Sequence, residues 1–241
     1  MPELLVEILS EEIPAHMQSK AADNLKLIVS HGLKEVGLDF SKAESYATPR
    51  RLALVIDGLN SQTSGVKGER KGPKTDATEK AVSGFKRSLP EGALIEERSS
   101  AKGNFFFASW EEAGRDTPNV LADCLPNLLQ ALPWPKSMRW GSHELRWVRP
   151  IHSLIAVFDG QPVPFQFGPF VAGAETYGHR FLSEKPFVVS NFAQYRSKLA
   201  KEKVILDPAE RRALILTQAT ELAESKGLML ADDPALLNEV A

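Results

Sequence analysis

The fold class is decided by residues 3–37, which read ELLVEILSEEIPAHMQSKAADNLKLIVSHGLKEVG and contain two different hydrophobic patterns. Residues 3–9 form a short apolar run that is typical of a β-strand. From residue 17 to residue 36 apolar side chains recur at helical spacing, and Gly37 is a suitable residue to end a helix. This stretch therefore predicts a strand that is followed by a helix.

The junction between these two elements has the composition of a helix start. Ser10 could cap the first turn, and Pro14 is favoured within it. Glu11 and Glu12 would then lie near the positive end of the helix dipole, where acids are favoured. The two acids could instead form a carboxylate pair for acid–base chemistry. Acids at a helix start are the commoner arrangement, and we expect that role here.

Further elements follow from the same kinds of pattern. Apolar or aromatic runs predict strands at residues 51–59, 103–110, 151–158, 163–167 and 185–189. Helical patterns occur at residues 77–87, 119–132 and from 191 onward. Pro126 should kink or split its helix, whereas Asp207 and Pro208 should begin one. Residues 61–75 are polar and rich in glycine and lysine, which predicts an exposed loop.

Together these elements predict an α+β fold, a mixed sheet with packed helices. We expect one domain over residues 1–190, followed by a helical segment over residues 191–241. The sequence ends in LLNEVA, within a helical pattern that has no stop signal. We therefore expect the helical segment to be the start of a further region of a longer protein.

Composition excludes several classes of protein. Hydrophobic residues make up 43% of the 241 residues, which is ordinary for a globular protein and sufficient for a core. The formal net charge of −2 argues against a globally basic nucleic-acid-binding protein, so any such binding must come from local patches. No run reaches the ~20 apolar residues of a membrane span, and the acidic N-terminus is not a secretory signal. Because Cys124 is the single cysteine, we expect a cytoplasmic protein with a buried, inert thiol.

The sequence shows no self-contained catalytic or metal-binding arrangement. Residues 68–75, GERKGPKT, lack the spacing of a phosphate-binding loop, and Pro73 removes a backbone donor there. The five histidines are scattered, and no serine lies in a G-x-S-x-G turn. His152 is either a structural histidine or a contact to a partner or to RNA. We therefore predict no catalytic residue, metal site or cofactor in this chain.

Cations gather in three stretches, and large aromatic residues accompany the third. Arg50 and Arg51 directly precede a strand, and four cations lie within residues 67–74. Residues 133–152, PWPKSMRWGSHELRWVRPIH, contain three of the four tryptophans together with four cations. RNA recognition uses cations on phosphates and aromatic planes on bases. The alternative is that the tryptophans pack in the core and the arginines cover them or pair with carboxylates.

Six segments occur in an order and at a spacing that resemble a known family. They are LLVEILSEEIP (4–14), YATPRRLAL (46–54), KGP (71–73), LPWPKSMRWG (132–141), WVRPIHSLIAVF (147–158) and GHRF (178–181). In these segments the chain resembles the N-terminal part of the beta subunit of bacterial glycyl-tRNA synthetase, of the heterotetrameric type. The resemblance covers most of residues 1–190 and is looser in the helical stretch to residue 241.

This resemblance implies a B3/B4-type α+β domain and a role in tRNA aminoacylation. The chain would be about the first third of a beta subunit, which binds tRNA(Gly) and joins an alpha subunit in a heterotetramer of two alpha and two beta subunits. The alpha subunit would bind ATP, magnesium and glycine, so this chain would be a non-catalytic part of a glycine–tRNA ligase. No membrane partner is implied.

The candidates for tRNA or subunit contact are the cations and the tryptophan at motif-matching positions, namely Arg50, Arg51, Lys71, Lys136, Arg139, Trp140, Arg149 and Arg180. Arg50 and Arg51 could instead anchor the fold through carboxylates such as Glu11 or Glu12. Two other functions stay open. One is a pure assembly module that contacts only the alpha subunit and never RNA. The other is a stand-alone small-molecule enzyme, which no motif supports.

Overall fold

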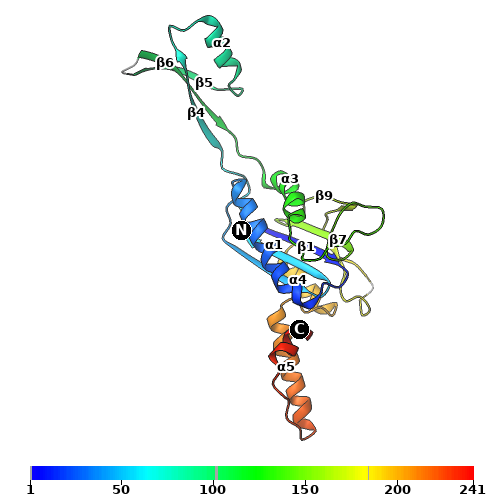
Figure 1. Cartoon of the computed structure of the whole chain (residues 1–241). Helices are drawn as coiled ribbons and strands as arrows, with labels where there is room; N and C mark the ends of the chain where they lie inside the picture. The colour runs from blue at the N-terminus through cyan, green and yellow to red at the C-terminus, as the bar shows by residue number, and fades with distance from the viewer. Residues whose placement is uncertain (1, 101–102, 184) are drawn as a thin grey trace. The chain divides into compact units, whose positions relative to one another are not determined.

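The computed structural model describes residues 2–100, 103–183 and 185–241, and its contacts divide the chain into two compact units (Figure 1). The first unit, here called the main unit, comprises residues 1–61 and 117–241. The second, here called the inserted unit, comprises Gln62–Asp116. The sequence predicted a domain boundary near residue 190, which lies inside the main unit. That boundary is a different division of the chain from the two units described here, and it stays a prediction.

The main unit is built on a five-stranded sheet in which β1 occupies the centre. The strand order is β2-β3-β1-β7-β8, and each neighbouring pair is antiparallel. The strands are β1 (Glu3–Ser10), β2 (Lys42–Thr48), β3 (Arg51–Asp57), β7 (Ile151–Phe158) and β8 (Gln161–Pro162). The predicted strands at 3–9, 51–59 and 151–158 are therefore confirmed, because each is a nearly continuous apolar run that suits a sheet covered on both faces.

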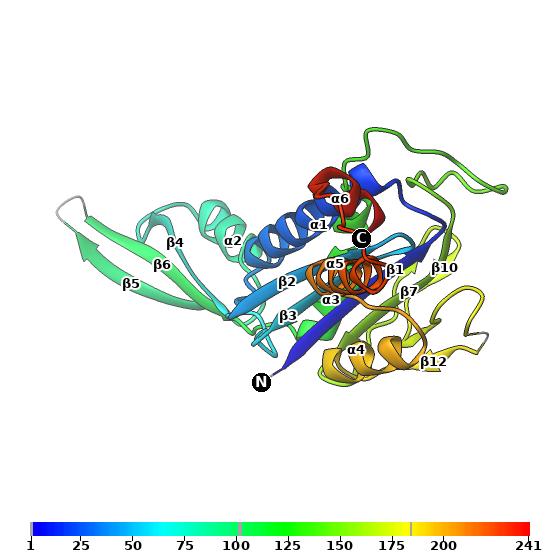
Figure 2. The same ribbon diagram turned by 90° about the horizontal axis from the view of Figure 1, so that it is seen from below.

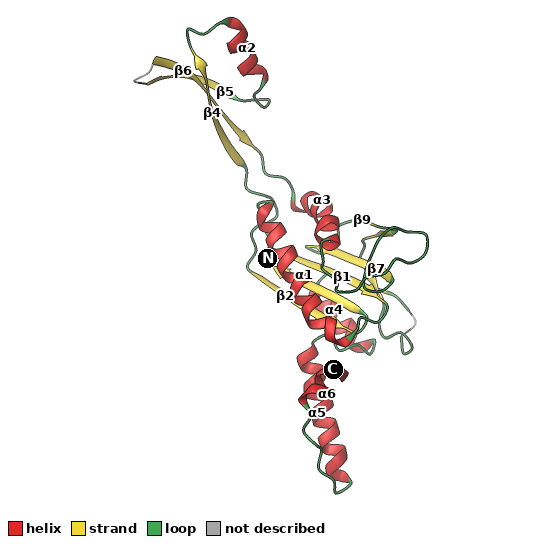
Figure 3. Ribbon diagram, viewed as in Figure 1, coloured by secondary structure: helices red, strands yellow, loops and turns green. Residues whose placement is uncertain are grey.

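Helices cover both faces of this sheet, and the strands and helices can be followed in Figures 2 and 3. Successive side chains of a strand point to opposite faces. Leu4, Val6 and Ile8 of β1 accordingly share one buried cluster with α1 (Ala15–Glu35) and α3 (Thr117–Gln130). Leu5 faces the other way and packs with α4 (Phe192–Lys201). The predicted α+β class is confirmed.

The helix after β1 begins later than the sequence indicated. Its N-cap is Pro14, and no side chain caps it. Ser10 is instead the last residue of β1, and its hydroxyl donates to the carbonyl of Glu11 at 2.9 Å. The first turn contains no acid, so the expected roles of Ser10, Glu11 and Glu12 at the helix start were wrong. The two glutamates lie in the connection between the elements, where cations surround them. The predicted end at Gly37 is confirmed, since its φ of 80° is readily adopted by glycine.

Short elements complete the main unit. They are β9 (Gln166–Phe167), β10 (Phe170–Val171), β11 (Glu175–Thr176), β12 (Phe187–Val188), α5 (Pro208–Ser225) and α6 (Pro234–Val240). Asp207 caps α5 by accepting a hydrogen bond from the Ala209 N–H at 2.8 Å, as predicted. The helix α3 continues through Pro126 without being split. Within the described ranges, no helix is both long and apolar enough to cross a membrane.

The inserted unit is a three-stranded antiparallel sheet with one helix. The strand order is β4-β6-β5, and the elements are β4 (Val66–Lys74), α2 (Glu79–Arg87), β5 (Leu94–Ser100) and β6 (Gly103–Glu112). The predicted loop at 61–75 was therefore wrong over most of its length. The glycines of β4 leave room for aromatic side chains that pack against the strand. A Cβ at Gly68 would lie 2.2 Å from Trp110, and one at Gly72 would lie 2.5 Å from Phe85.

Candidate functional site

Four chain segments meet around Glu11, at the end of β1 where Glu11 and Glu12 leave the sheet. His152 at the start of β7 forms a hydrogen bond of 2.7 Å to Glu11, and Arg180 donates to Glu11 at 3.0 Å. Arg180 also donates to Glu12 at 3.1 Å. Arg50, in the turn between β2 and β3, has its guanidinium 3.8 Å from Glu11 and 3.9 Å from Glu12. We call these five residues the Glu11 cluster.

The Glu11 cluster is held in place by backbone contacts as well as by charge. Arg50 Nε donates to the carbonyl of Ser10 at 3.2 Å, and the Glu11 N–H donates to the carbonyl of Pro150 at 2.8 Å. The hydrogen bond from His152, aided by the charges of Arg50 and Arg180, holds the pKa of Glu11 below its ordinary value. Both carboxylates are therefore engaged by Arg50 and Arg180, and Glu11 also by His152, which favours a structural role over the acid–base pair that was the alternative interpretation.

A second polar group is buried behind this cluster, on the face of the sheet that packs against α4. Glu7 is fully buried and accepts short hydrogen bonds from the hydroxyls of Thr176 and Tyr195. Arg51 is only 2% exposed; its Nε lies 3.3 Å from Glu7, and its Nη2 donates to the carbonyl of Tyr177 at 2.7 Å. Burial, reinforced by the charge of Glu7, raises the pKa of Tyr195 well above its ordinary value. The phenol therefore stays protonated and donates.

These contacts support the alternative that the two adjacent arginines anchor the fold. Arg51 presents almost no surface to a partner, and its carboxylate is Glu7 rather than Glu11 or Glu12. Arg50 is partly exposed and pairs with both of the predicted carboxylates. Arg180 keeps part of its guanidinium exposed, and its Cζ lies 5.4 Å from the ring centre of Phe181. Of these three arginines, Arg180 offers the most surface to an external partner.

The tryptophan-rich loop at residues 133–149 has a rigid base and an exposed cationic edge. Trp147 is 1% exposed and meets the rings of Trp134 and Phe167 edge-on, at centroid distances of 5.2 and 5.8 Å. The backbones of Trp147 and Met138 exchange two hydrogen bonds, of 2.8 and 3.1 Å. This base supports both interpretations of the loop, since the tryptophans pack while the cations beyond them stay free for a partner.

The predicted contact residues of this loop differ in exposure. Lys136 and Arg139 are exposed, and neither forms an ion pair with any residue that the structure describes. Trp140 is half-buried and packs against the core. Arg149 is half-buried, and its Nη1 donates to the carbonyl of Val148 at 2.8 Å. Of the four predicted contact residues in this loop, Lys136 and Arg139 are therefore the cations that are exposed and free of an ion pair among the described residues.

Lys71 belongs to the inserted unit and does not join the other seven candidates. It lies on β4, and its Nζ is 3.6 Å from the ring centre of Phe105, on the neighbouring strand β6. Lys74 lies 6.0 Å from the same ring centre. The predicted candidates therefore fall into three places: the Glu11 cluster with the adjoining Arg51, the 133–149 loop, and the strand β4 of the inserted unit.

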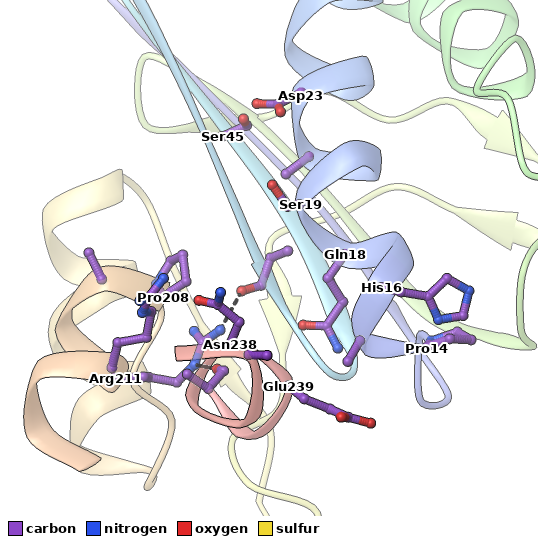
Figure 4. Close-up of a pocket in the computed structure, with 17 residues that line it drawn as sticks. Pro14, His16, Gln18, Ser19, Asp23, Ser45, Pro208, Arg211, Asn238 and Glu239 are labelled. Atoms are coloured by element: carbon purple, nitrogen blue, oxygen red, sulfur yellow. Dashed lines mark hydrogen bonds between the residues drawn. The ribbon is translucent and has the colours of Figure 1, made fainter. Parts of the chain in front are cut away.

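A pocket of about 1100 Å³ lies between the start of α1 and the helices α5 and α6 (Figure 4). Its wall includes Arg211, whose guanidinium donates to the carbonyls of Ala47 and Ala241. The acids and the imidazole of the lining, Asp23, Glu239 and His16, do not point toward one another (Figure 4). Across the described part of the chain, no three metal-ligating side chains come together. Burial raises the pKa of the half-buried Cys124 thiol to about 11, which is the state expected of an inert thiol.

Sequence reasoning missed the buried group around Glu7, although one signal was present. Glu7 is the only charged residue between Leu4 and Leu9, and the other residues of that run are all apolar. A buried charge requires a partner. That partner could not be identified, because Arg51, Thr176 and Tyr195 lie far from Glu7 in the sequence.

The Glu11 cluster makes stability depend on pH. Because its folded pKa is lowered, ionised Glu11 stabilises the fold above its ordinary pKa, and this contribution is lost as pH falls through the folded value. We expect the Glu11→Gln variant to be less stable than the original chain near neutral pH, and the difference to shrink between about pH 5 and about pH 3. Urea denaturation at a series of pH values measures this. A difference that stays constant with pH would contradict the assignment.

Comparison with known proteins supplies relatives over the whole chain. A family described as Glycyl-tRNA synthetase beta subunit matches residues 4–241. The glycine–tRNA ligase beta subunit of Paracoccus denitrificans is 45% identical over 246 residues, and that of Rhodospirillum centenum is 42% identical over 267 residues. Both alignments cover 100% of this chain, but only 36% and 37% of the respective relatives. The chain therefore spans about a third of the length of these relatives.

Proposed function

Because the chain belongs to the family of glycyl-tRNA synthetase beta subunits, we propose that it is the N-terminal part of such a subunit and supports tRNA binding and subunit assembly. The reaction of the assembled enzyme is the ATP-dependent attachment of glycine to tRNA(Gly). We assign that chemistry, with ATP and magnesium, to an alpha subunit, and the assembly to two alpha and two beta subunits in the cytoplasm.

The observation that carries the RNA-binding part of this proposal is the 133–149 loop. Lys136 and Arg139 are exposed cations without a carboxylate partner among the described residues, and the packed Trp147 holds the loop that carries them. Cations of this kind release counterions when they bind phosphates. A rigid base lowers the entropy that is lost when they are ordered on a partner.

A non-catalytic role for the chain is supported by the way its polar groups are used. Among the described residues, Glu11 and His152 are the acid and imidazole that approach one another most closely, and both are engaged within the Glu11 cluster. Glu7 is enclosed by hydroxyls and a guanidinium. These groups stabilise the junctions between strands, which suits a part that presents surfaces to RNA and to another subunit.

The salt dependence of tRNA binding tests this proposal. The Lys136→Ala/Arg139→Ala variant should bind tRNA(Gly) more weakly at low salt, and the slope of log affinity against log salt should be about 2 smaller in magnitude, because two phosphate contacts are lost. Filter binding or fluorescence anisotropy over a range of salt concentrations measures both quantities. The matched control is Lys20→Ala/Lys226→Ala, which removes two exposed cations outside the loop.

The same measurement separates the proposal from the assembly module. If the original chain bound no tRNA at low salt but still bound the alpha subunit, RNA contact would be refuted and assembly alone would remain. If the chain bound tRNA and the loop variant matched the control variant, the role assigned to Lys136 and Arg139 would be wrong.

A further inference from the structure

A second, smaller pocket in the main unit is lined by an unusual number of cations. It has a volume of about 330 Å³ and lies where the β2–β3 turn, residues 178–181 and residues 203–205 meet. Its lining includes Arg50, Arg51, Arg180, Lys203 and Arg211, with Glu12 as the carboxylate among the lining residues. Carboxylates outside the lining act on four of these cations: Glu7 lies beside Arg51, Glu11 lies beside Arg50 and Arg180, and the charge of Asp207 acts on Arg211. Lys203 is therefore the lining cation that is most open to an added anion.

Two of these cations form no ion pair with a carboxylate among the described residues. Arg211 donates to the backbone carbonyls of Ile205, Leu206 and Ala47, at 2.9, 2.9 and 3.0 Å, and its Nε donates to the carbonyl of Ala241. Burial lowers the pKa of Arg211, and the charge of Asp207 opposes this shift. Lys203 is exposed and forms no ion pair within the described ranges. An anion entering the pocket would supply a counter-charge to Lys203.

The backbone at this pocket is held in an uncommon conformation. Lys203 has a φ of 64°, in the left-handed region that non-glycine residues seldom adopt. The neighbouring chain is clamped: the His179 N–H donates to the carbonyl of Glu202 at 2.8 Å, and the Ser183 hydroxyl donates to the Glu202 carboxylate at 2.5 Å. A Cβ at Gly178 would lie 2.3 Å from the Cβ of Glu202. Lys203 directly follows the C-cap Glu202 of α4, where a left-handed residue is a common way to end a helix, and the Val204 N–H donates to the carbonyl of Leu199 at 2.8 Å. The end of the helix thus fixes the position of Lys203 in the pocket.

An exposed aromatic ring stands beside the cations. Phe181 lines the pocket and is 77% exposed, although a phenylalanine is normally buried. The guanidinium of Arg180 lies against this ring, as noted above. Single-stranded RNA is bound by combining cations for the phosphate with an aromatic ring on which a base stacks.

We propose that this pocket binds the phosphate group of a nucleotide whose base stacks on Phe181, and that the nucleotide belongs to a single-stranded part of the tRNA. The proposal rests on the proposed function and adds a second RNA contact to the 133–149 loop. Lys203, which forms no ion pair within the described ranges, supplies the free cation for the phosphate, while Arg180 joins the phosphate position to the ring.

The test uses the 241-residue chain with three probes: inorganic phosphate, adenosine 5′-monophosphate and a short single-stranded RNA. Lys203→Ala should weaken the binding of all three by about tenfold, because a charge-assisted hydrogen bond is lost. Phe181→Ala should weaken the nucleotide and the RNA by at least about fivefold but leave inorganic phosphate unchanged, because only a base can stack. Isothermal titration calorimetry measures the phosphate and the mononucleotide, and fluorescence anisotropy measures the RNA.

Matched controls lie next to both positions. Lys201→Ala removes an exposed cation two residues from Lys203, and Leu182→Ala removes an exposed apolar side chain next to Phe181; neither residue lines the pocket. Equal affinities for Lys203→Ala and Lys201→Ala would overturn the pocket. The pocket would bind a free nucleotide, and not RNA, if phosphate and mononucleotide affinities fell in the Lys203 and Phe181 variants but the RNA bound no more tightly than the mononucleotide. That result would overturn the assignment to tRNA. Binding of tRNA that responds only to Lys136 and Arg139 would overturn the pocket and leave the proposed function intact.

Discussion

Replacement of Arg51 by Met should lower the free energy of unfolding by about 3–5 kcal/mol, because it leaves Glu7 as a buried, uncompensated charge. Glu7 is fully buried, and no other cation is in contact with it among the described residues. The hydroxyls of Thr176 and Tyr195 still donate to Glu7 in this variant, but they carry no positive charge. Urea denaturation followed by tryptophan fluorescence or circular dichroism measures the loss.

The adjacent arginine provides the control for this prediction. Arg50 is partly exposed, and its guanidinium is 3.8 Å or more from its two carboxylates, so Arg50→Met should cost no more than about 1 kcal/mol. The double variant Glu7→Gln/Arg51→Met should recover part of the loss, because it removes both charges together. Equal losses for Arg50→Met and Arg51→Met would show that the Glu7–Arg51 pair does not anchor the sheet.

Most elements of the core could be predicted from the sequence, because their patterns are local. The strands β1, β3 and β7 are continuous apolar runs, and α1 shows apolar residues at helical spacing. The strand β4 could not be predicted in this way. Its glycines and lysines are typical of a loop, and what makes it a strand is its pairing with the aromatic strand β6 and the close approach of Phe85 and Trp110. That information is tertiary, and it overrides local propensity.

The candidate site was predictable only in part, for a similar reason. Motif matching selected Arg50, Arg51 and Arg180, and the structure places all three beside carboxylates in or directly after β1, while their role as contacts stays a prediction. It could not separate the buried Arg51 from the exposed Arg180, because burial depends on segments more than 120 residues apart, such as the contact of Arg51 with Tyr177. Lys203 carried no sequence signal, since its importance comes from a backbone conformation and from the neighbours that folding brings to it.

Replacement of Trp147 by Ala should produce a loss of similar size, about 3–5 kcal/mol of unfolding free energy, by leaving a cavity where a large side chain was buried. The substitution should also weaken tRNA binding, although Trp147 itself is buried and does not contact a partner. Trp147 holds Trp134 and Phe167 by edge-on ring contacts and pairs its backbone with Met138, so its loss loosens the loop that carries Lys136 and Arg139. At a temperature where the variant is still folded, tRNA affinity should fall although both cations are present.

Two further substitutions test whether the loss of packing at Trp147 causes the loss of stability and of tRNA affinity. Its Nε1 has no acceptor among the described residues, so Trp147→Phe loses no hydrogen bond and should retain most of the stability and the tRNA affinity. Trp140→Ala removes a half-buried ring next to the exposed cations and should cost less stability than Trp147→Ala, while weakening any contact that this ring makes to tRNA or to the alpha subunit. If Trp147→Ala destabilised the chain but left tRNA affinity at the level of the original protein, the loop would not be a preorganised RNA contact, and its cations would act independently of the packed tryptophans.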